Sequence, residues 1–262
     1  MIDPIRKYHY FASDFHLGVP SNEDSIIREK KIVAWLAAIE KDAMAIYLVG
    51  DIFDFWFEYK HAIPKGFVRL QGKIIELIEK GIQVHFFLGN HDMWMFDYFE
   101  KELGVKIHPN ELELEINHKS LYIAHGDGLG PGDRGYKLIK KIFRNPFCQW
   151  AFARLHPNFG IPLAKYFSKT SRRTTGDDDA HLNSLDKEWL YQYTKSEQKS
   201  KHRDFYIFGH RHLPLKFEIQ NTSYLNLGEW LNFCTFGRFD GDKFELLQWK
   251  DNQMMPFKTI SE

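Results

Sequence analysis

Three apolar runs in the first ninety residues each end in polar side chains. YHYFASD (8–14), AMAIYLVGD (43–51) and IQVHFFLGN (82–90) have the length and composition of buried strands. Between them, apolar residues recur at helical spacing over residues 25–41 and about 66–80. This order of strand, helix, strand, helix and strand predicts parallel βαβ units. The polar ends of the three strands should therefore meet at one edge of a sheet, where sites form in such folds.

The second half of the chain predicts short strands on both sides of a helical segment. VKIHP, ELELEI and SLYIAHGD read as strands, with a turn at Asn117-His118. Strands return from about residue 204, and the pattern predicts an antiparallel meander with a hairpin at Asp240-Gly241. Residues 130–200 are instead helical, basic and aromatic, with four proline breaks. We expect one layered α/β domain formed by residues 1–129 and 201–262, with 130–200 as a helical cap insertion.

Composition narrows the class of protein further. Lysine plus arginine number 35, equal to aspartate plus glutamate, so no extended nucleic-acid surface is expected. The two cysteines, Cys148 and Cys234, do not form a disulfide framework, which favours a reducing compartment. We see neither a signal peptide at the N-terminus nor a stretch of about 18 apolar residues. These features predict a soluble, cytoplasmic protein.

Five polar groups follow predicted strands, and four of them contain histidine. Each group alone is common, but together they offer carboxylate, amide and imidazole ligands, which suit divalent Mn, Fe or Zn. Two adjacent cations repel each other, so a carboxylate should bridge them, and Asp51 is central in the predicted strand order. The groups are Asp14 with His16, Gly50-Asp51, Gly89-Asn90-His91-Asp92, His125-Gly126-Asp127 and Gly209-His210-Arg211-His212.

The order D-x-H, G-D, G-N-H-D, H-G-D, G-H-x-H resembles that of the calcineurin-like metallophosphoesterase superfamily. The resemblance covers all five blocks and implies an α/β/β/α sandwich, an enzyme that hydrolyses phosphoesters, and two divalent metal ions, with manganese first and iron or zinc as alternatives. It implies that one metal is held by Asp14, His16, Asp51 and His212, and the other by Asp51, Asn90, His125 and His210. It further implies that His91 contacts the phosphate as a general acid and that Asp92 orients His91 through a hydrogen bond.

Several longer segments resemble the UDP-2,3-diacylglucosamine hydrolases of lipid A biosynthesis: FASDFHLG, GDIFDFWFEY, GHRHLP and the start of the insertion. That resemblance implies a pyrophosphatase acting on an acylated UDP-sugar and releasing UMP and 2,3-diacylglucosamine 1-phosphate. The best-known of these enzymes carry arginine (GNRD) where this chain has His91. Another phosphoester, including a nucleotide or a nucleic-acid phosphodiester, remains an alternative substrate, and so does a non-catalytic module stabilised by metals. The expected substrate contacts are Asn90, His91, Tyr136, Ser171 and Arg172.

The insertion places aromatic and aliphatic residues among lysines and arginines over residues 136–155. A basic amphipathic segment of this kind fits a membrane surface or a pocket for acyl chains. It would make the protein peripheral on the inner membrane, although a helical lid packed on its own domain is an equal alternative.

Three further polar residues in or near the five groups are not expected to bind metal directly. Asp127 is expected to cap a turn or to support a ligand from behind. Arg211 is expected to be a solvated side chain, with a phosphate contact as the less favoured alternative. Asp54, three residues after Asp51, is expected to orient a ligand.

Overall fold

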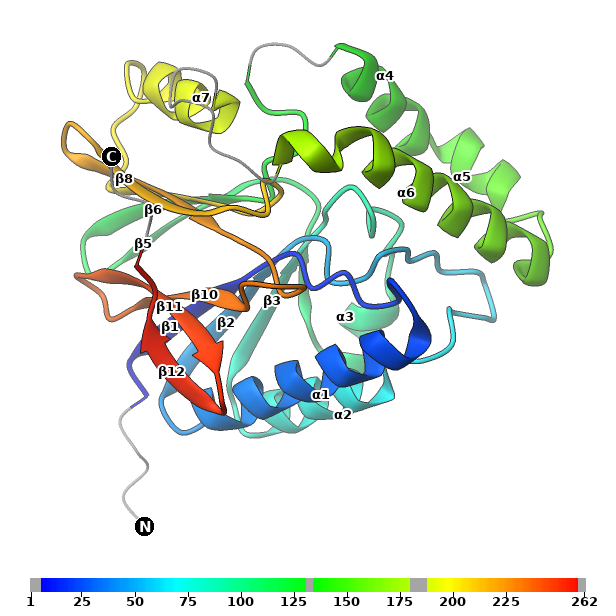
Figure 1. Ribbon diagram of the computed structural model, residues 1–262, viewed down its shortest axis with the longest axis horizontal. Helices are drawn as coiled ribbons and strands as arrows, with labels where there is room; N and C mark the ends of the chain where they lie inside the picture. Colours follow the sequence, from blue (N-terminus) through cyan, green and yellow to red (C-terminus); the bar gives the residue numbers. More distant parts are fainter. Residues whose placement is uncertain (1–5, 131–133, 180–187, 259–262) are drawn as a thin grey trace.

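Two packed sheets with helices on their outer faces form the body of the molecule (Figure 1). The computed structural model describes residues 6–130, 134–179 and 188–258, without the side chains of 134–136 and 169–179. The larger sheet has the strand order β12-β11-β10-β1-β2-β3-β4. Its strands are β1 (Tyr8–Ala12), β2 (Ala43–Val49), β3 (Gln83–Phe87), β4 (Lys106–His108), β10 (Thr235–Phe239), β11 (Phe244–Lys250) and β12 (Gln253–Pro256).

The smaller sheet has the strand order β5-β6-β7-β9-β8. Helices α1 and α2 cover the outer face of the larger sheet, and α7 covers the outer face of the smaller one (Figure 1). This arrangement is the α/β/β/α sandwich that the resemblance implied. The elements are β5 (Leu112–Ile116), β6 (Lys119–Ala124), β7 (Phe205–Phe208), β8 (Pro214–Ile219), β9 (Thr222–Leu227), α1 (Asn22–Ile39), α2 (Val68–Glu79), α3 (Tyr98–Leu103) and α7 (Trp189–Glu197).

The two predicted βαβ units are confirmed. Strand β2 pairs in parallel with both β1 and β3, through the crossover helices α1 and α2. Helix α1 starts three residues earlier than predicted, because the side chain of Ser21 accepts a hydrogen bond from the Asp24 amide and caps the helix. The carboxyl ends of β1, β2 and β3 therefore lie at one edge of the sheet, as expected.

Apolar side chains fill the space on both faces of the central strands. Trp35 and Ile74 belong to the core between the larger sheet and its helices, whereas Phe11, Phe87 and Ile207 belong to the core between the two sheets. Burial on both faces explains why the first three strands are nearly continuous apolar runs rather than alternating ones.

The predicted single meander at the C-terminal end is wrong. Strand β7 pairs in parallel with β6 and β9, and the β8–β9 hairpin stays in the smaller sheet. The chain then crosses to the larger sheet, where β10 pairs antiparallel with β1 and forms the expected hairpin with β11. Apolar alternation identifies a strand but does not say which sheet it joins, and this is why the crossing was missed.

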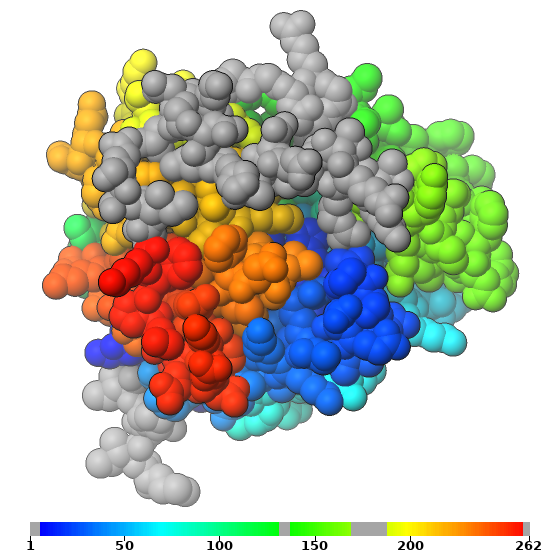
Figure 2. Space-filling model, viewed as in Figure 1, coloured from blue at the N-terminus to red at the C-terminus, as the bar shows by residue number. Residues whose placement is uncertain are grey.

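Three helices of the insertion lie together beside the carboxyl edge of the larger sheet: α4 (Arg134–Phe143), α5 (Pro146–Phe152) and α6 (Pro157–Asp179). Figure 2 shows this green segment projecting at one side, next to the blue N-terminal segment. We call these three helices the cap. Phe152 of the cap packs on Phe57 and Trp94, and the Trp94 indole donates a hydrogen bond of 2.8 Å to the Phe143 carbonyl.

Helix α7 belongs to the same segment, 130–200, but packs on the smaller sheet instead. The division of the chain into a domain of residues 1–129 plus 201–262 and an insertion of residues 130–200 stays a prediction.

Among the described helices, none has the length and apolar character needed to cross a bilayer.

Candidate metal centre

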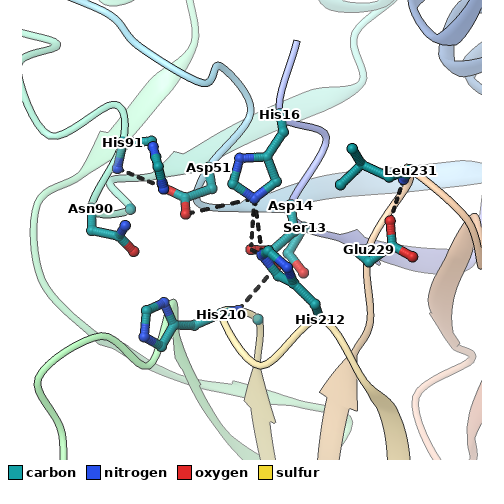
Figure 3. A network of polar contacts seen from close by, with 12 residues as sticks. Ser13, Asp14, His16, Asp51, Asn90, His91, His210, His212, Glu229 and Leu231 are labelled. Atoms are coloured by element: carbon teal, nitrogen blue, oxygen red, sulfur yellow. Dashed lines mark hydrogen bonds and ion pairs between the residues drawn. The ribbon is translucent and has the colours of Figure 1, made fainter. Parts of the chain in front are cut away.

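The seven predicted metal ligands come together at the carboxyl ends of strands from both sheets. Figure 3 shows six of them, with the side chains of Asp14, His16, Asp51 and His212 directed toward one another. The seventh, His125, follows β6 of the smaller sheet and lies 3.4 Å from Asp51 by its Nε2 atom. Residues more than one hundred positions apart thus form one buried polar cluster.

One side of the cluster is formed by Asp14, His16 and His212. The Nε2 atoms of the two histidines are 2.9 Å apart, and Asp14 Oδ1 lies 3.2 Å from His212 Nε2. Asp14 and His16 are fully buried, and Asp14 Oδ1 has no hydrogen-bond donor within the described residues. A buried carboxylate oxygen without a donor is costly unless a cation satisfies it, so this group fits a divalent metal.

The other side contains Asp51, Asn90, His125 and His210. His125 Nδ1 lies 2.9 Å from the Val49 carbonyl, which can only accept, so Nδ1 carries the proton. The Nε2 lone pair then faces Asp51 Oδ2 at 3.4 Å and Asn90 Oδ1 at 3.2 Å. Three acceptors converge here, and a cation between them resolves the conflict. A backbone carbonyl that fixes the tautomer of a histidine is the usual support for a metal ligand.

The electrostatics of His125 show that this position favours a positive charge. Burial lowers the pKa of the imidazole, but the Asp51 carboxylate outweighs burial and raises the pKa to about 10. A proton on Nε2 supplies that charge when no cation is bound, and a metal ion would replace the proton. By contrast, burial lowers the pKa of His210 to about 4, which keeps that ring neutral and able to bind a metal.

Asp51 lies between the two sides. It falls within 4.8 Å of His125 and His210 on one side, and within the same distance of His16 and His91 on the other. Its second oxygen, Oδ1, accepts a hydrogen bond of 2.8 Å from the His91 amide, which fixes the carboxylate plane. This is the placement that a bridging carboxylate needs.

Five of the candidate ligands have a left-handed backbone, which is uncommon for residues other than glycine. Each such conformation costs on the order of 1 kcal/mol or more, and strain of this kind gathers at functional sites. The φ angles are 56° at Asp14, 44° at His16, 53° at Asp51, 68° at His210 and 54° at His212. The fold therefore holds these side chains inward at a cost in local conformational energy.

Gly89 is required by close approach rather than by its backbone angle. A Cβ at this position would lie 2.2 Å from Asp51 Oδ1 and 2.5 Å from the Asp51 amide nitrogen. We expect Gly89→Ala to push Asp51 out of place and to lower kcat about 100-fold, since a 1 Å misplacement can cost that much. The measurement is hydrolysis of a chromogenic phosphodiester at saturating manganese.

Gly72→Ala is the matched control, because a Cβ there meets nothing within 4 Å on helix α2. This variant should keep full activity and gain up to about 1 kcal/mol of stability. Full activity in Gly89→Ala would show that the position of Asp51 does not matter.

The prediction that Asp92 orients the His91 ring through a hydrogen bond is wrong. Its carboxylate accepts hydrogen bonds from the backbone amides of Ile52, Phe53 and Gly89, at 2.8, 3.4 and 2.8 Å. These bonds tie the loop after β2 to the loop after β3, and no contact with the His91 ring occurs in the described part of the chain. Burial and the neighbouring Asp51 charge raise the pKa of Asp92 to about 7.

His91 is instead held by Asp54 and Ser168. His91 Nδ1 lies 3.0 Å from the Asp54 carbonyl and 2.9 Å from Ser168 Oγ, which comes from helix α6 of the cap. The Asp54 carboxylate also lies 3.6 Å from His16 Nδ1, in line with its expected part in orienting a ligand. Ser168 was missed, because a serine within a helix carries no sequence signal for this contact.

Asp127 and Arg211 are both buried and ion-paired. Asp127 forms a 2.6 Å ion pair with Lys140 of the cap. Arg211 pairs with Glu188 at 2.8 Å, so the expectation of a solvated side chain is wrong.

The side chains of Tyr136, Ser171 and Arg172 lie outside the described residues, although their backbones fall in helices α4 and α6.

Comparison with known proteins agrees with this geometry. The sequence profile of the calcineurin-like phosphoesterase family matches residues 10–214. A protein of Porphyromonas gingivalis named UDP-2,3-diacylglucosamine hydrolase is 38% identical over 94% of this chain and 99% of its own length. Proteins of the same name from Vibrio atlanticus and Salmonella typhi are each 28% identical, over 90% of this chain and 95% and 97% of their own lengths. The chain therefore belongs to the calcineurin-like phosphoesterase family and is a hydrolase, as the sequence predicted.

Proposed function

We propose that the cluster holds two divalent cations that share Asp51. Asp14, His16, Asp51 and His212 would hold one, and Asp51, Asn90, His125 and His210 the other. The observation that carries this proposal is the convergence of carboxylate, amide and imidazole ligand atoms on both sides of Asp51, with Asp14 Oδ1 left without a hydrogen-bond donor among the described residues. Manganese is our first choice, and iron or zinc would accept the same oxygen and nitrogen ligands.

Divalent cations at such a site orient a phosphoester, acidify a water molecule and stabilise the leaving oxygen. The chain itself supplies His91, whose Nδ1 is fixed by the Asp54 carbonyl, so that Nε2 is free to meet a phosphate oxygen. Burial lowers the pKa of His91 to about 4. An anionic phosphate beside the ring would raise that pKa, so we propose that His91 gains its proton with the substrate and donates it to the leaving group.

The proposed substrate is UDP-2,3-diacylglucosamine, hydrolysed to UMP and 2,3-diacylglucosamine 1-phosphate. The names of the relatives, which match over nearly their full length, support it. The cap supports it independently, because Phe152 of α5 and Ile161 and Ala164 of α6 pack on an apolar cluster that includes Met93 and Trp94, directly after the Gly89–Asp92 group, and this apolar surface suits acyl chains. Tyr136, Ser171 and Arg172 stay in this proposal as substrate contacts, together with Asn90 and His91.

The test is incubation of the purified protein with UDP-2,3-diacylglucosamine and manganese, followed by mass spectrometry of the products. We expect UMP and the acylated sugar phosphate in equal amounts, and neither from a protein stripped of metal. Turnover of a simple phosphodiester without release of UMP would leave the phosphoesterase standing and remove this substrate.

The cap also carries the features of a membrane-facing surface. Phe147 is 71% exposed and stacks with Trp150, which is 53% exposed, and Leu138 and Ile139 of α4 are exposed nearby in sequence. Lys137, Lys140 and Lys141 lie on α4 beside Leu138 and Ile139, as in interfacial helices that bind anionic lipids. We propose that the protein is cytoplasmic and attaches peripherally to the inner membrane through these residues.

The double variant Phe147→Ser/Trp150→Ser tests this attachment. Burying even half of each aromatic side chain is worth about 1 kcal/mol, so the variant should bind vesicles about tenfold less tightly or worse. The measurement is co-sedimentation with vesicles of phosphatidylethanolamine and phosphatidylglycerol. Ile27→Ser is the control, since Ile27 is 63% exposed on α1 at another face. Equal vesicle binding by all three proteins would contradict the proposal.

A further inference from the structure

The loop that carries His210 and His212 is strained on both sides of Arg211. Both histidines have positive φ, and the Arg211 amide donates a short-range hydrogen bond of 2.8 Å to the Gly209 carbonyl. A turn this tight sends neighbouring side chains in opposite directions. The two imidazoles reach the candidate metal centre, whereas the Arg211 guanidinium is buried behind it, near the start of α7.

Glu188, the residue just before α7, and Trp189, the first residue of α7, contact this guanidinium. Glu188 Oε2 accepts from Arg211 Nε at 2.8 Å, and both side chains are almost fully buried. The Trp189 ring lies 4.8 Å from the guanidinium and 6.0 Å from the His210 ring, so it packs on both neighbours in the loop. Arginine is suited to such a site, because its planar group can stack and donate at the same time.

The same helix turn also supports the other loop of the smaller sheet. Leu190 is fully buried and lies so close to Gly126 that a Cβ there would meet its Cδ1 at 3.0 Å and the His210 Cβ at 3.6 Å. Gly126 directly follows His125. Residues 188–190 therefore contact the neighbours of the candidate ligands: Glu188 and Trp189 contact Arg211, Trp189 also contacts the His210 ring, and Leu190 contacts Gly126.

We propose that Arg211 and Glu188 are positioning residues for both metals, and that α7 is a support of the metal centre rather than part of the cap. Glu188 compensates the guanidinium charge, so the pair holds the loop without adding net positive charge beside two cations. Since His210 and His212 face different sides of the centre, loss of the pair should weaken both metal-binding steps. This inference rests on the proposed function in one respect, the binding of two cations.

The experiment is calorimetric titration of manganese into the full-length protein stripped of metal, comparing Arg211→Lys with Arg203→Lys. Arg203 is the matched control, because it is also buried, pairs with Glu113 and packs on the rings of Tyr122 and Tyr206. Residues that support metal ligands typically change affinity 10- to 100-fold, and we expect a loss of about that size for both steps in Arg211→Lys alone. Excess manganese should restore kcat with KM unchanged.

Wild-type affinities in Arg211→Lys, or the same loss in Arg203→Lys, would overturn the inference. If Arg211→Lys does not fold, Glu188→Gln replaces it, because glutamine keeps an acceptor oxygen and removes only the charge. Unchanged binding in Glu188→Gln would then overturn it. A wild-type protein that binds fewer than two manganese ions would overturn the proposed function itself, which separates the two failures.

Discussion

Asp51→Asn should lower phosphoester hydrolysis by about 1,000-fold or more while leaving the fold intact. The carboxylate lies between both groups of candidate ligands, and the amide that replaces it removes the charge that two cations would share. Metal ions contribute several kcal/mol of transition-state stabilisation, and each 1.36 kcal/mol is a factor of ten in rate. The measurement is kcat on a chromogenic phosphodiester at saturating manganese.

A thermal shift on adding manganese gives the second readout for this variant. A ligand that binds only the folded state stabilises it by mass action, so wild-type protein should melt at a higher temperature with manganese and Asp51→Asn should not. Asp204→Asn is the control, because Asp204 is a partly buried carboxylate that accepts hydrogen bonds from Ser120 on the smaller sheet. Normal hydrolysis in Asp51→Asn would remove the shared carboxylate from the mechanism.

His91→Ala should lower kcat about 100-fold or more, the lower end of what a general acid contributes. Its content of bound manganese should stay at the wild-type level, because Asn90 and Asp51 remain in place. The acid works only while protonated, so wild-type kcat should fall as pH rises through the pKa of His91 in the substrate complex. That alkaline fall should be missing in the variant.

The alternative for His91 is a ligand, since its ring lies within 4.8 Å of ligand atoms of His16 and Asp51. Proportional loss of metal and rate in His91→Ala would support that alternative and remove the acid. His108→Ala serves as control, because His108 is a partly buried histidine at the end of β4 that contacts His85 and not the centre.

The sequence predicted which ligands of the first sheet lie together, because the order of its strands determines this. Asp14, Asp51 and Asn90 were expected together because parallel strands joined by right-handed crossovers bring their carboxyl ends to one edge. His125 and His210 lie on the second sheet, and no local pattern shows that the two sheets place their edges together. They were included because each follows an apolar run and offers a ligand, and the resemblance then placed them with the other three.

The sequence did not determine the directions in which the side chains around the site point. Asp92 follows His91 directly, yet its carboxylate turns toward three backbone amides because a loop residue faces wherever unpaired donors lie. Arg211 was predicted to be a surface residue, because the sequence does not show that Glu188 and Trp189 at the start of α7 cover it. Ser168 reaches His91 from 77 positions away on helix α6, which packs on the cluster of Phe57 and Trp94 through Ile161 and Ala164.

Anomalous X-ray diffraction from crystals grown with manganese tests the central claim most directly. Two peaks about 3.5–4 Å apart are expected, the spacing of paired metals in hydrolases, with Asp51 touching both. His16 and His212 should lie against one peak, and His125 and His210 against the other. A single peak, or two peaks that Asp51 does not join, would contradict the account.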